Sequence, residues 1–456
     1  MALLLAACGA TPPREDLGEA EIKAAWIELG PSDAAIARAI TSANACPSIT
    51  VDGSAFTMTV RVGAAIVPLR PTASAPADSK PSAFPVTVCE HDVRRGATQA
   101  SIGARVLPLP RTSPQRIVVL GDSGCRLKNF DNAWQNCDDA AAWPFASVAA
   151  TAARFAPDLV IHVGDYHYRE NACPASNAGC RGSPWGYGWD AWQADFFAPA
   201  APLLAAAPWI VVRGNHEECA RAGQGWFRFL DPRPFEAKRS CDDPADDVNA
   251  NYSASYAVPI GADVQVIVFD SAKAGYTPLP ESDPQFRAYR EQFEEARALT
   301  NRSSVASVFA SHHPLLGFVP QSGAPPLPGN AALLSVASTL FGTRYFPGGV
   351  ELALHGHIHD FQAIGFASQP ATVIAGIGGD YLDVELPDPF PPTLSPAPGT
   401  VVGTIAHGAR FGFVLLERHE TRWRVNAYTR DGRVLTRCTL SAATLLCDKT
   451  GLLAAF

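Results

Sequence analysis

Five short blocks of the sequence carry side chains that can bind metal ions. They combine aspartate, asparagine, tyrosine and histidine with glycine or proline: Gly121-Asp122-Ser123-Gly124, Gly164-Asp165-Tyr166-His167-Tyr168, Gly214-Asn215-His216-Glu217, Ser311-His312-His313-Pro314 and Gly356-His357-Ile358-His359. Their oxygen and nitrogen ligands suffice for two adjacent metal ions. Two ions about 3.5–4 Å apart can activate a water molecule and stabilise the entering and leaving oxygens of an in-line displacement. The blocks therefore predict a two-metal hydrolytic site.

Most of these blocks follow a short apolar run, which predicts how the fold positions them. The runs cover residues 116–120, 158–163, 209–212, 305–309 and 351–354. Short apolar runs that are rich in β-branched residues and end in glycine or proline are typical of buried strands. The carboxyl ends of several such strands meet at one edge of a sheet, where open α/β folds place their active sites. We therefore expect the five blocks to converge at that edge.

The order of the blocks resembles that of the calcineurin-like metallophosphoesterases and, within them, the purple acid phosphatases. Most members of the larger family carry a histidine two residues after the first aspartate, a position that is Gly124 in this chain. The purple acid phosphatases also lack that histidine and have instead a tyrosine three residues after the second aspartate, which matches Tyr168. A phenolate is a harder and more basic donor than imidazole, and it favours Fe(III) over Fe(II). The lost histidine and the gained tyrosine together indicate the purple subfamily.

The resemblance implies two metal ions, Fe(III) and a divalent ion that would be Zn, Fe or Mn. The implied ligands are Asp122, Asp165, Tyr168 and His359 for the first ion, and Asp165, Asn215, His312 and His357 for the second, with Asp165 as the bridge. It also implies that a metal-bound hydroxide hydrolyses a small-molecule phosphate ester, foremost a phosphomonoester. A phosphodiesterase with the same ligands is the alternative. A surface lipoprotein that binds metal or phosphate without catalysis is a third hypothesis, which the complete ligand set disfavours.

Two further histidines in the blocks are candidates for catalysis. His216 follows the ligand Asn215, and we expect it to face the substrate and to protonate the leaving group. The alternative is that His216 only orients Asn215 or Glu217. Two adjacent histidines at a strand end point in different directions, so with His312 as a ligand we expect His313 to line the pocket.

Three further residues are candidates for substrate binding. Arg213 precedes Gly214 and could clamp a phosphate oxygen, although a salt bridge at the strand end is equally compatible with its position. His167 lies on the loop of the second block and is expected to reach the substrate. His407 precedes Gly408 and is expected to approach the site.

Composition excludes several classes of protein. The 456 residues carry a net charge of −8, with 18% charged and 47% hydrophobic residues, which is typical of a globular protein large enough for two domains. The acidic balance and the lack of a Lys/Arg-rich stripe argue against a nucleic acid as the main partner. No apolar run approaches the roughly 18 residues of a membrane span. The oligomeric state is not readable from the sequence.

The cysteines predict an exported protein. Leu5-Ala6-Ala7-Cys8 resembles a bacterial lipobox, so we expect Cys8 to carry a lipid that anchors a periplasmic or cell-surface lipoprotein. The residues before Cys8 are too few for a normal signal peptide, and an incidental cysteine is the alternative. The other ten cysteines fall into neighbouring couples, which favours disulfides in an oxidising compartment. The sequence does not determine the connectivity, and nearest-neighbour pairing would join Cys46 with Cys89, Cys125 with Cys137, Cys173 with Cys180, Cys219 with Cys241, and Cys438 with Cys447.

The remaining patterns predict an α/β fold with two β-sheets packed as a sandwich, flanked by helices and preceded by a small all-β domain. Residues 1–21 are expected to be a leader remnant and tether, 22–110 the β domain, and 114–456 the metallophosphoesterase domain. Helices are expected near 140–155, 190–204 and 284–299. Strands are expected at 252–258 and 264–269, with a closing meander at 411–416, 422–428 and 434–440. Residues 34–40 alternate in polarity, which favours a strand over a short helix.

Overall fold

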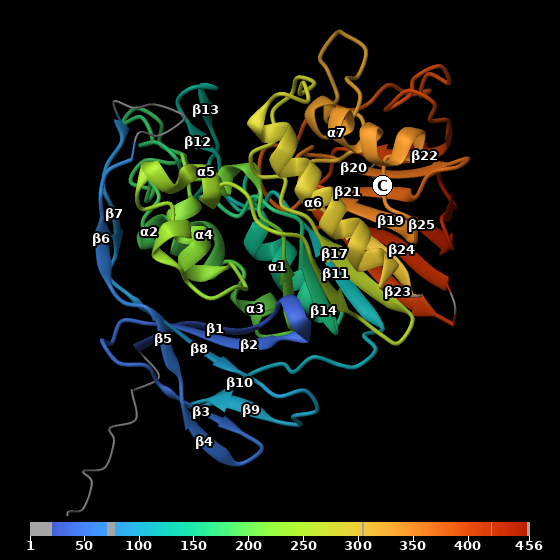
Figure 1. Cartoon of the computed structure of the whole chain (residues 1–456). Coiled ribbons are helices and arrows are strands. Elements are labelled where there is room, and N and C mark those ends of the chain that lie inside the picture. The colour runs from blue at the N-terminus through green and yellow to red at the C-terminus, as the bar shows by residue number, and fades with distance from the viewer. Residues whose placement is uncertain (1–20, 71–77, 303–304, 421, 454–456) are drawn as a thin grey trace, which may run out of the picture.

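The computed structural model describes residues 21–70, 78–302, 305–420 and 422–453. In this part of the chain two large β-sheets pack face to face, and helices cover their outer faces (Figure 1). Cys8 and the predicted tether up to residue 20 lie outside the described residues. The predicted two-sheet sandwich, flanked by helices and preceded by a strand-rich segment, is confirmed.

The first sheet runs from the closing meander, through three parallel strands, to the amino-terminal strands. In the described residues its order is β26-β25-β24-β23-β11-β14-β15-β1-β2-β8-β5. The strands are β1 (Ile22–Leu29), β2 (Ala35–Thr41), β5 (Thr59–Val62), β8 (Thr87–Asp92), β11 (Arg116–Leu120), β14 (Leu159–His162), β15 (Trp209–Val211), β23 (Gly412–His419), β24 (Arg422–Thr429), β25 (Val434–Ser441) and β26 (Thr444–Cys447). Neighbours β11, β14 and β15 pair in parallel, so their carboxyl ends lie at one edge.

The second sheet also has a parallel centre. Its order in the described residues is β16-β17-β18-β19-β21-β20-β22-β27, and β17, β18, β19 and β21 are parallel. The strands are β16 (Tyr256–Pro259), β17 (Val264–Val268), β18 (Ala306–Ala310), β19 (Val350–His355), β20 (Phe361–Phe366), β21 (Ala371–Ala375), β22 (Val402–Gly408) and β27 (Gly451–Leu452). The predicted meander and the strand pair near 252–269 are thus present.

Smaller sheets and helices complete the described part of the chain. The short strands are β3 (Ser48–Val51), β4 (Ser54–Thr57), β6 (Ala65–Val67), β7 (Ser82–Phe84), β9 (Ala100–Ile102), β10 (Arg105–Val106), β12 (Leu127–Lys128) and β13 (Ala133–Trp134). The α-helices are α1 (Phe145–Arg154), α2 (Trp189–Trp192), α3 (Ala201–Leu204), α4 (Gly223–Phe229), α5 (Asp247–Ala250), α6 (Pro284–Asn301) and α7 (Ala331–Phe341).

Strand β11 shows why these apolar runs form central strands. Its side chains point alternately to the two faces of the sheet. Ile117 and Val119 enter the core between the two sheets, whereas Val118 and Leu120 pack in the cluster that includes residues of helix α1. Both faces are therefore buried, and a continuous apolar run suits that position better than alternation with polar residues.

Prolines set the helix bounds that the sequence placed only roughly. Helix α1 begins at Phe145, directly after Pro144, and not at residue 140, because the residue before a proline is disfavoured in helical conformation. The helix expected at 190–204 is divided into α2, a π-helical turn at Gln193–Phe197, and α3. Pro199 and Pro202 lie at that division, and neither has a backbone N–H to donate. Helix α7 was not predicted.

The amino-terminal strands extend the first sheet. Strand β1 pairs in parallel with β15, and β2 and β8 continue the sheet outward, so residues 35–41 are the expected strand. Arg38 is buried and pairs with Glu28 at 2.9 Å. Its guanidinium also donates to the carbonyl oxygens of Phe229 and Asp231 at 2.7 and 2.6 Å. The division at residues 110–114 stays a prediction, but the strands before it share a sheet with those after it.

All five predicted disulfides form. They join Cys46 to Cys89, Cys125 to Cys137, Cys173 to Cys180, Cys219 to Cys241, and Cys438 to Cys447. The nearest-neighbour pairing is therefore confirmed. One bond closes the loop that carries β12 and β13, and another links β25 to β26.

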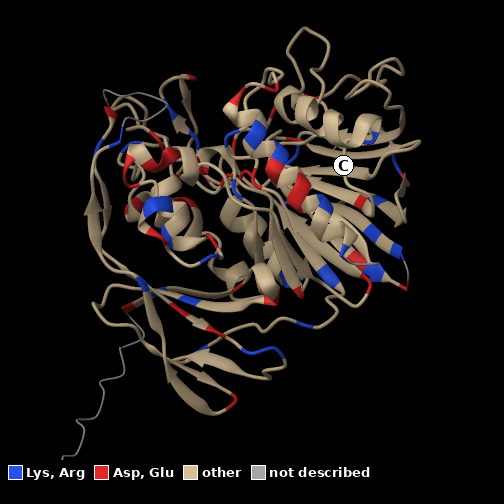
Figure 2. Cartoon of the chain, viewed as in Figure 1, with Lys and Arg blue, Asp and Glu red and all other residues tan. Residues whose placement is uncertain are grey.

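Charges of both signs are mixed over the fold, as along α6, where Arg287, Arg290 and Arg297 lie among Glu291, Glu294 and Glu295 (Figure 2). That a nucleic acid is not the main partner stays a prediction. Among the described residues no helix combines the length and apolar character that crossing a membrane requires.

Candidate metal centre

Three of the predicted ligands stand on strained backbone at strand ends. Asp122, Asp165 and His357 have φ values of 57°, 59° and 70°, in the left-handed region that residues other than glycine rarely occupy. Each follows a glycine within two residues of the end of a parallel strand, β11, β14 or β19. Strain of this kind is kept where the surrounding structure enforces it, commonly at functional sites. The sharp turn brings the three side chains to the same edge of the sandwich.

Tyr168 lies at the centre of one group of donors. Its hydroxyl oxygen is 3.0 Å from Asp122 Oδ1, 2.8 Å from Asp165 Oδ2 and 3.0 Å from His359 Nε2. His359 Nε2 is also 3.2 Å from Asp122 Oδ1. Three of the four residues that the family resemblance assigns to the first ion therefore surround the hydroxyl of the fourth, Tyr168.

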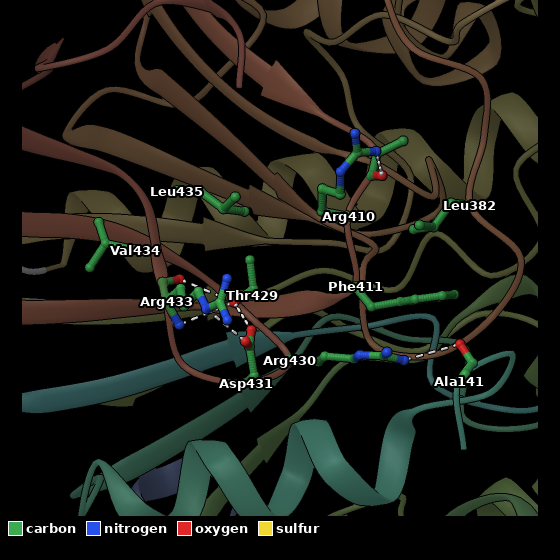
Figure 3. Close-up of a pocket in the computed structure, with 11 residues that line it drawn as sticks. Ala141, Leu382, Arg410, Phe411, Thr429, Arg430, Asp431, Arg433, Val434 and Leu435 are labelled. Atoms are coloured by element: carbon green, nitrogen blue, oxygen red, sulfur yellow. Dashed lines mark hydrogen bonds and ion pairs between the residues drawn. The ribbon is translucent and has the colours of Figure 1, made fainter. Parts of the chain in front are cut away.

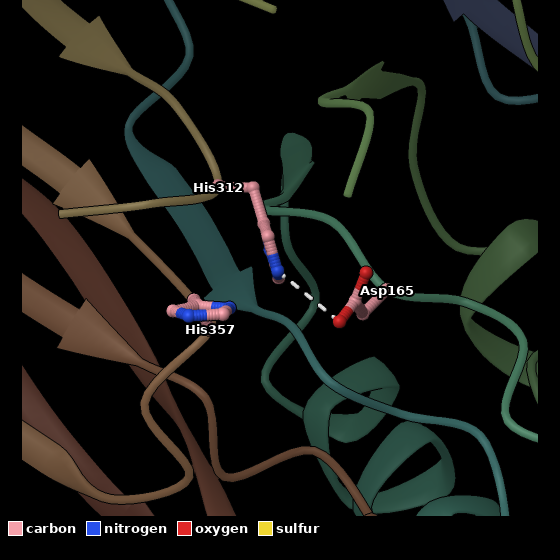
Figure 4. A group of neighbouring side chains, drawn as sticks. All are labelled: Asp165, His312 and His357. Atoms are coloured by element: carbon pink, nitrogen blue, oxygen red, sulfur yellow. Dashed lines mark ion pairs between the residues drawn. The ribbon is translucent and has the colours of Figure 1, made fainter. Parts of the chain in front are cut away.

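Asn215 lies at the centre of the other group. Its Oδ1 is 2.9 Å from His312 Nε2 and 3.0 Å from His357 Nδ1. His312 Nε2 is also 3.1 Å from Asp165 Oδ2. Asp165, His312 and His357 offer ligand atoms that all lie within 4.8 Å of one another (Figure 4). Asp165 Oδ2 thus contacts both groups, which is the position that a bridging ligand needs.

Two buried carboxylates hold the loops that carry these ligands. Glu217 accepts hydrogen bonds from the backbone N–H groups of Asp165, Tyr166, His167 and Gly214 at 2.9–3.2 Å. Asp195 accepts from the backbone N–H groups of Tyr168 and Cys125 at 2.7 and 3.0 Å. The loops of the first three blocks are therefore connected by hydrogen bonds from their main-chain N–H groups to these two side chains.

Close packing explains two glycines of the blocks. A Cβ at Gly214 would lie 2.0 Å from Asp165 Oδ1, so no side chain fits there. A Cβ at Gly124 would lie 2.8 Å from the backbone nitrogen of Tyr168 and 2.9 Å from Asp195 Oδ2. The loop that presents Tyr168 thus occupies the space that a histidine at position 124 would need.

The electrostatics of the two groups fit metal cations. Burial lowers the pKa of His312, but Asp165 outweighs burial and raises it to about 9. Burial acts likewise on His359, where Asp380 and Asp122 raise the pKa to about 10. Burial, Asp122 and Asp165 raise the pKa of the Tyr168 phenol well above its usual range, so a phenolate there requires a nearby cation. Carboxylate, phenol, amide and imidazole donors gathered in this way suit two ions of the kind that the sequence predicts.

Asp165, Tyr168, Asn215, His357 and His359 of the two groups form the floor of a cleft of about 380 Å³. Residues from both sheets line it: Arg126, Lys128, Asp165, Tyr168, Asn215, His216, Tyr276, Val319, Leu327, His357, Ile358, His359, Tyr381, Leu382 and Asp383. A volume of this size suits a small molecule. The cleft therefore gives a small ester access to the predicted metal ligands.

His216 is the histidine that stands beside the ligands and faces the cleft. Its Nδ1 lies 2.8 Å from Glu170 Oε1, and Arg221 Nε lies 3.0 Å from the same oxygen. Its Nε2 is 4.0 Å from Asp165 Oδ2. Burial and Arg221 lower the pKa of His216 to about 3, against Asp165 and Glu170, which raise it. Glu170 thus orients the ring so that Nε2 faces the reacting region.

The sequence matches one family over more than half of the chain. The model of the calcineurin-like phosphoesterase family covers residues 115–361, which include all five blocks. This chain belongs to the calcineurin-like phosphoesterases. It is therefore a phosphoric ester hydrolase of a family with a dinuclear metal centre, and the predicted family is confirmed.

Solved structures share the fold of this phosphoesterase. It is similar to a purple acid phosphatase from yellow lupin (Lupinus luteus) seeds, with a TM-score of 0.54 and 16% identity over 91% of this chain and 74% of that chain. It is similar to PhoD with a TM-score of 0.54 and 10% identity, over 97% of this chain and 94% of that chain. At these identities the likeness shows a common fold. No match is found among curated proteins.

Two of the predicted site residues are buried behind the cleft of this phosphoesterase. His313 is turned away from the ligand position of His312, and its Nδ1 lies 3.2 Å from Ser271 Oγ. Its ring is 4.0 Å from that of His357, so it supports a ligand and does not line the cleft. His167 is buried between Tyr187 and Trp192, with ring centroids 5.5 and 5.6 Å away. Contact of His313 or His167 with substrate stays a prediction. Their buried positions do not support it.

The other two predicted substrate-binding residues also lie outside the cleft lining. Arg213 donates to the carbonyl oxygens of Glu217 and Ala250 at 2.9 and 2.7 Å and is 3.5 Å from Asp270 Oδ2. This geometry favours the strand-end salt bridge over a phosphate clamp. His407 is buried in β22, with its ring 6.4 Å from that of Phe390. Neither position supports the predicted binding role.

The structure adds an ion pair that the sequence did not reveal as part of the site. Arg126 lines the cleft, its guanidinium carbon is 5.1 Å from the centre of the Tyr168 ring, and its Nη2 is 3.4 Å from His359 Nδ1. Asp380 binds the guanidinium through Nε at 3.0 Å and Nη2 at 2.6 Å. A signal for Asp380 existed, because it follows Gly378-Gly379 after the apolar run of β21, as the other blocks follow theirs.

A second cavity, of about 400 Å³, adjoins the cleft at Leu382 but lacks the chemistry of the first (Figure 3). None of the predicted metal ligands lines this cavity, and all of them belong to the part of the chain that the structure describes. Its three arginines have partners: Arg410 pairs with Glu385 at 2.9 Å, Arg433 pairs with Asp431 at 3.0 Å, and Arg430 donates to the carbonyl oxygens of Ala140 and Ala141. Guanidinium groups do not bind metal cations, so this cavity does not suit the predicted metal centre.

Proposed function

We propose that this protein hydrolyses phosphomonoesters with Fe(III) bound beside Tyr168 and a divalent ion, Zn, Fe or Mn, bound beside His312 and His357. The observation that carries the proposal is the position of Asp165 Oδ2, which lies 2.8 Å from the Tyr168 hydroxyl and 3.1 Å from His312 Nε2. Asp165 Oδ2 therefore contacts both donor groups, and only one of these groups contains a phenol. That asymmetry supports two different ions.

The side chains of the chain divide the work of the reaction. Asp122, Asp165, Tyr168 and His359 would hold one ion, and Asn215, His312 and His357 would hold the other together with Asp165. When bound, such a pair activates water and polarises the phosphoryl group. His216 donates a proton from Nε2 to the leaving alkoxide oxygen as the P–O bond breaks, while Glu170 keeps the ring oriented through Nδ1. A bound phosphate dianion raises the pKa of His216 from its low value and so prepares it for this role.

Metal analysis and two substrates test this function together. The purified protein should contain about two metal ions per chain, one of them iron. It should hydrolyse nitrophenyl phosphate faster than bis(nitrophenyl) phosphate at equal concentration. Preference for the bis-ester would establish the phosphodiesterase alternative. Full metal content with turnover of neither ester would establish a metal-binding protein without this activity.

We also propose that the protein is exported in a bacterium and anchored through a lipid on Cys8. The five disulfides support an oxidising compartment. Expression of the full sequence behind a bacterial leader should give a membrane-associated protein that incorporates labelled palmitate. Cys8→Ser should release it to the soluble fraction without changing its activity. Equal labelling of both proteins would contradict the assignment of Cys8.

A further inference from the structure

The cleft has exposed apolar side chains above its polar floor. Tyr276, Leu327 and Tyr381 line it and are 71%, 52% and 42% exposed. Val319 and Leu382 lie among them and are partly exposed. We call these five residues the apolar rim. Exposed apolar surface around a site with a few convergent polar groups is typical of surface that contacts a ligand.

Exposed hydrophobic side chains are concentrated in the apolar rim. Thirteen large hydrophobic side chains are exposed in the described part of the chain, and three of them belong to the rim. These three come from separate loops: Tyr276 from the loop after β17, Leu327 from that after β18, and Tyr381 from that after β21. Convergence of three loops on one opening is a property of the fold and not of any local stretch of sequence.

Contacts within the protein hold the rim in place. Val319 and Leu327 exchange two backbone hydrogen bonds of 2.9 Å. Tyr381 donates its hydroxyl to the carbonyl oxygen of Trp134 at 2.9 Å, and its own carbonyl oxygen lies 2.6 Å from His359 Nδ1. The loop of Tyr276 is tied to the start of α7, where Asn330 Nδ2 donates to the carbonyl oxygen of Gly275 at 3.0 Å. A pre-ordered surface loses little entropy when it binds a ligand.

Tyr276 presents an aromatic face to the opening. Its ring lies roughly parallel to that of His357, at 5.9 Å between centroids and 25° between planes. Its hydroxyl is 3.5 Å from His357 Nε2. Since one face lies against His357 and the side chain is largely exposed, the other face is open for a planar group to stack on.

The charged side chains of the cleft argue against a second anionic group on the substrate. The two cations that line the cleft, Arg126 and Lys128, both have carboxylate partners. Arg126 is bound by Asp380, and Lys128 Nζ lies 2.9 Å from Asp131. Their charges are therefore compensated, and the cleft offers a distal group more apolar than cationic surface.

We propose that the apolar rim binds the alcohol part of the ester, so that preferred substrates carry an aromatic or similarly flat apolar group next to the phosphate. This inference rests on the proposed function and specifies its substrate class. The phosphoryl group lies on the floor beside Asp165 and Asn215, and the alcohol part extends over Tyr276 and Leu327.

Two esters with chemically similar leaving groups test the proposal. The wild-type protein should have a kcat/KM for 2-naphthyl phosphate about fivefold above that for phenyl phosphate, as expected when one additional ring is partly buried. Tyr276→Ala and Leu327→Ala should each lower this ratio about twofold to fivefold, because they remove contact area. Differences in leaving-group acidity cancel when the ratio is compared between variants. Tyr276→Phe should keep the ratio, since the ring remains.

A matched control and a binding assay separate the outcomes. Leu446 is 61% exposed on β26 and lies outside the cleft lining, so Leu446→Ala should leave the ratio unchanged. An unchanged ratio in the Tyr276→Ala and Leu327→Ala variants as well would overturn the proposal while hydrolysis itself stands. If the wild-type protein hydrolyses neither ester, the proposed function fails. Calorimetry with 2-naphthylphosphonate and phenylphosphonate then tests the rim alone, and equal affinity would reject it.

Discussion

The floor of the cleft is buried and polar, whereas its rim is exposed and apolar. Floor residues such as Asp165 and Tyr168 are almost without solvent contact, and each makes several polar contacts of about 3 Å. Rim residues such as Tyr276 and Leu327 are exposed to solvent, and their side chains make few polar contacts. Buried polar groups are strongly coupled to their neighbours, while exposed apolar groups act through contact area. The floor therefore determines which reaction occurs, and the rim determines which ester is preferred.

The largest effect should come from the residue that joins the two donor groups. Asp165→Asn removes the charge that both ions would share, so both ions and all turnover should be lost. Loss of metal affinity should exceed the roughly 10–100-fold that outer partners of metal ligands cost. Metal analysis after gel filtration measures the ions, and hydrolysis of phenyl and naphthyl phosphate should fall equally. A variant that keeps one ion and half its activity would contradict the bridging position.

His216→Ala should have the next largest effect, and a selective one. Loss of a positioned proton donor should lower turnover of alkyl phosphates by roughly 10²–10⁴-fold. A nitrophenolate leaves with little help from an acid, so its ester should lose much less. Metal content should stay unchanged, because His216 is not among the predicted metal ligands. Equal losses for both esters, or loss of an ion, would show that His216 supports the metal ligands and is not the acid.

Tyr168→Phe should affect one ion only. The oxidised wild-type protein should have a visible tyrosinate-to-iron charge-transfer band, and the variant should lack it. Removal of this donor should also weaken iron binding about 10–100-fold or more, while the second ion stays bound. Visible spectra with metal analysis provide the measurement. A colourless, iron-free and fully active wild-type protein would exclude the purple subfamily and leave the phosphoesterase family untouched.

The smallest effect should be seen in the pH dependence of the metal-free protein. The pKa values of His312 and His359 are raised from about 6.5 to about 9 and 10, so the folded protein binds these protons more tightly than the unfolded chain does. That contribution to stability is complete below about pH 6.5 and is lost as the pH rises through 9 and 10. The Tm of chelated protein should therefore fall between about pH 7 and pH 10.

Metal loading supplies the control for this titration. Ions displace the protons from both imidazoles, so loading near pH 7.5 should release up to about two protons that are not released near pH 11. Calorimetry in buffers of different ionisation enthalpy counts them. The loaded protein should not show the alkaline fall in Tm, and an identical fall in both forms would assign it to other groups, such as Glu217 or Glu28, whose pKa values are raised to about 8.

The sequence by itself determined the floor of the cleft. Metal ligands must be particular residue types, and strands of this fold must end in tight turns, so Asp122, Asp165, Asn215 and His357 each stand beside a glycine after an apolar run. The chemistry and the backbone constraint both leave a local pattern. The neighbouring cysteines were similarly local, although only the structure decided their pairing. The helix at 331–341 left a weaker pattern and was missed.

Only the tertiary structure decided which other residues join the site. His167, Arg213 and His313 lie in or beside the blocks in sequence and His407 lies well beyond them, yet all four side chains are buried outside the cleft lining. Arg126, Asp380, Tyr276 and Leu327 reach the cleft from loops that meet only after both sheets have packed. No strict chemical or backbone requirement applies to an arginine or tyrosine that lines a cleft, so its role leaves no signature in the sequence. Its position results from the packing of distant elements, which no single stretch of sequence contains.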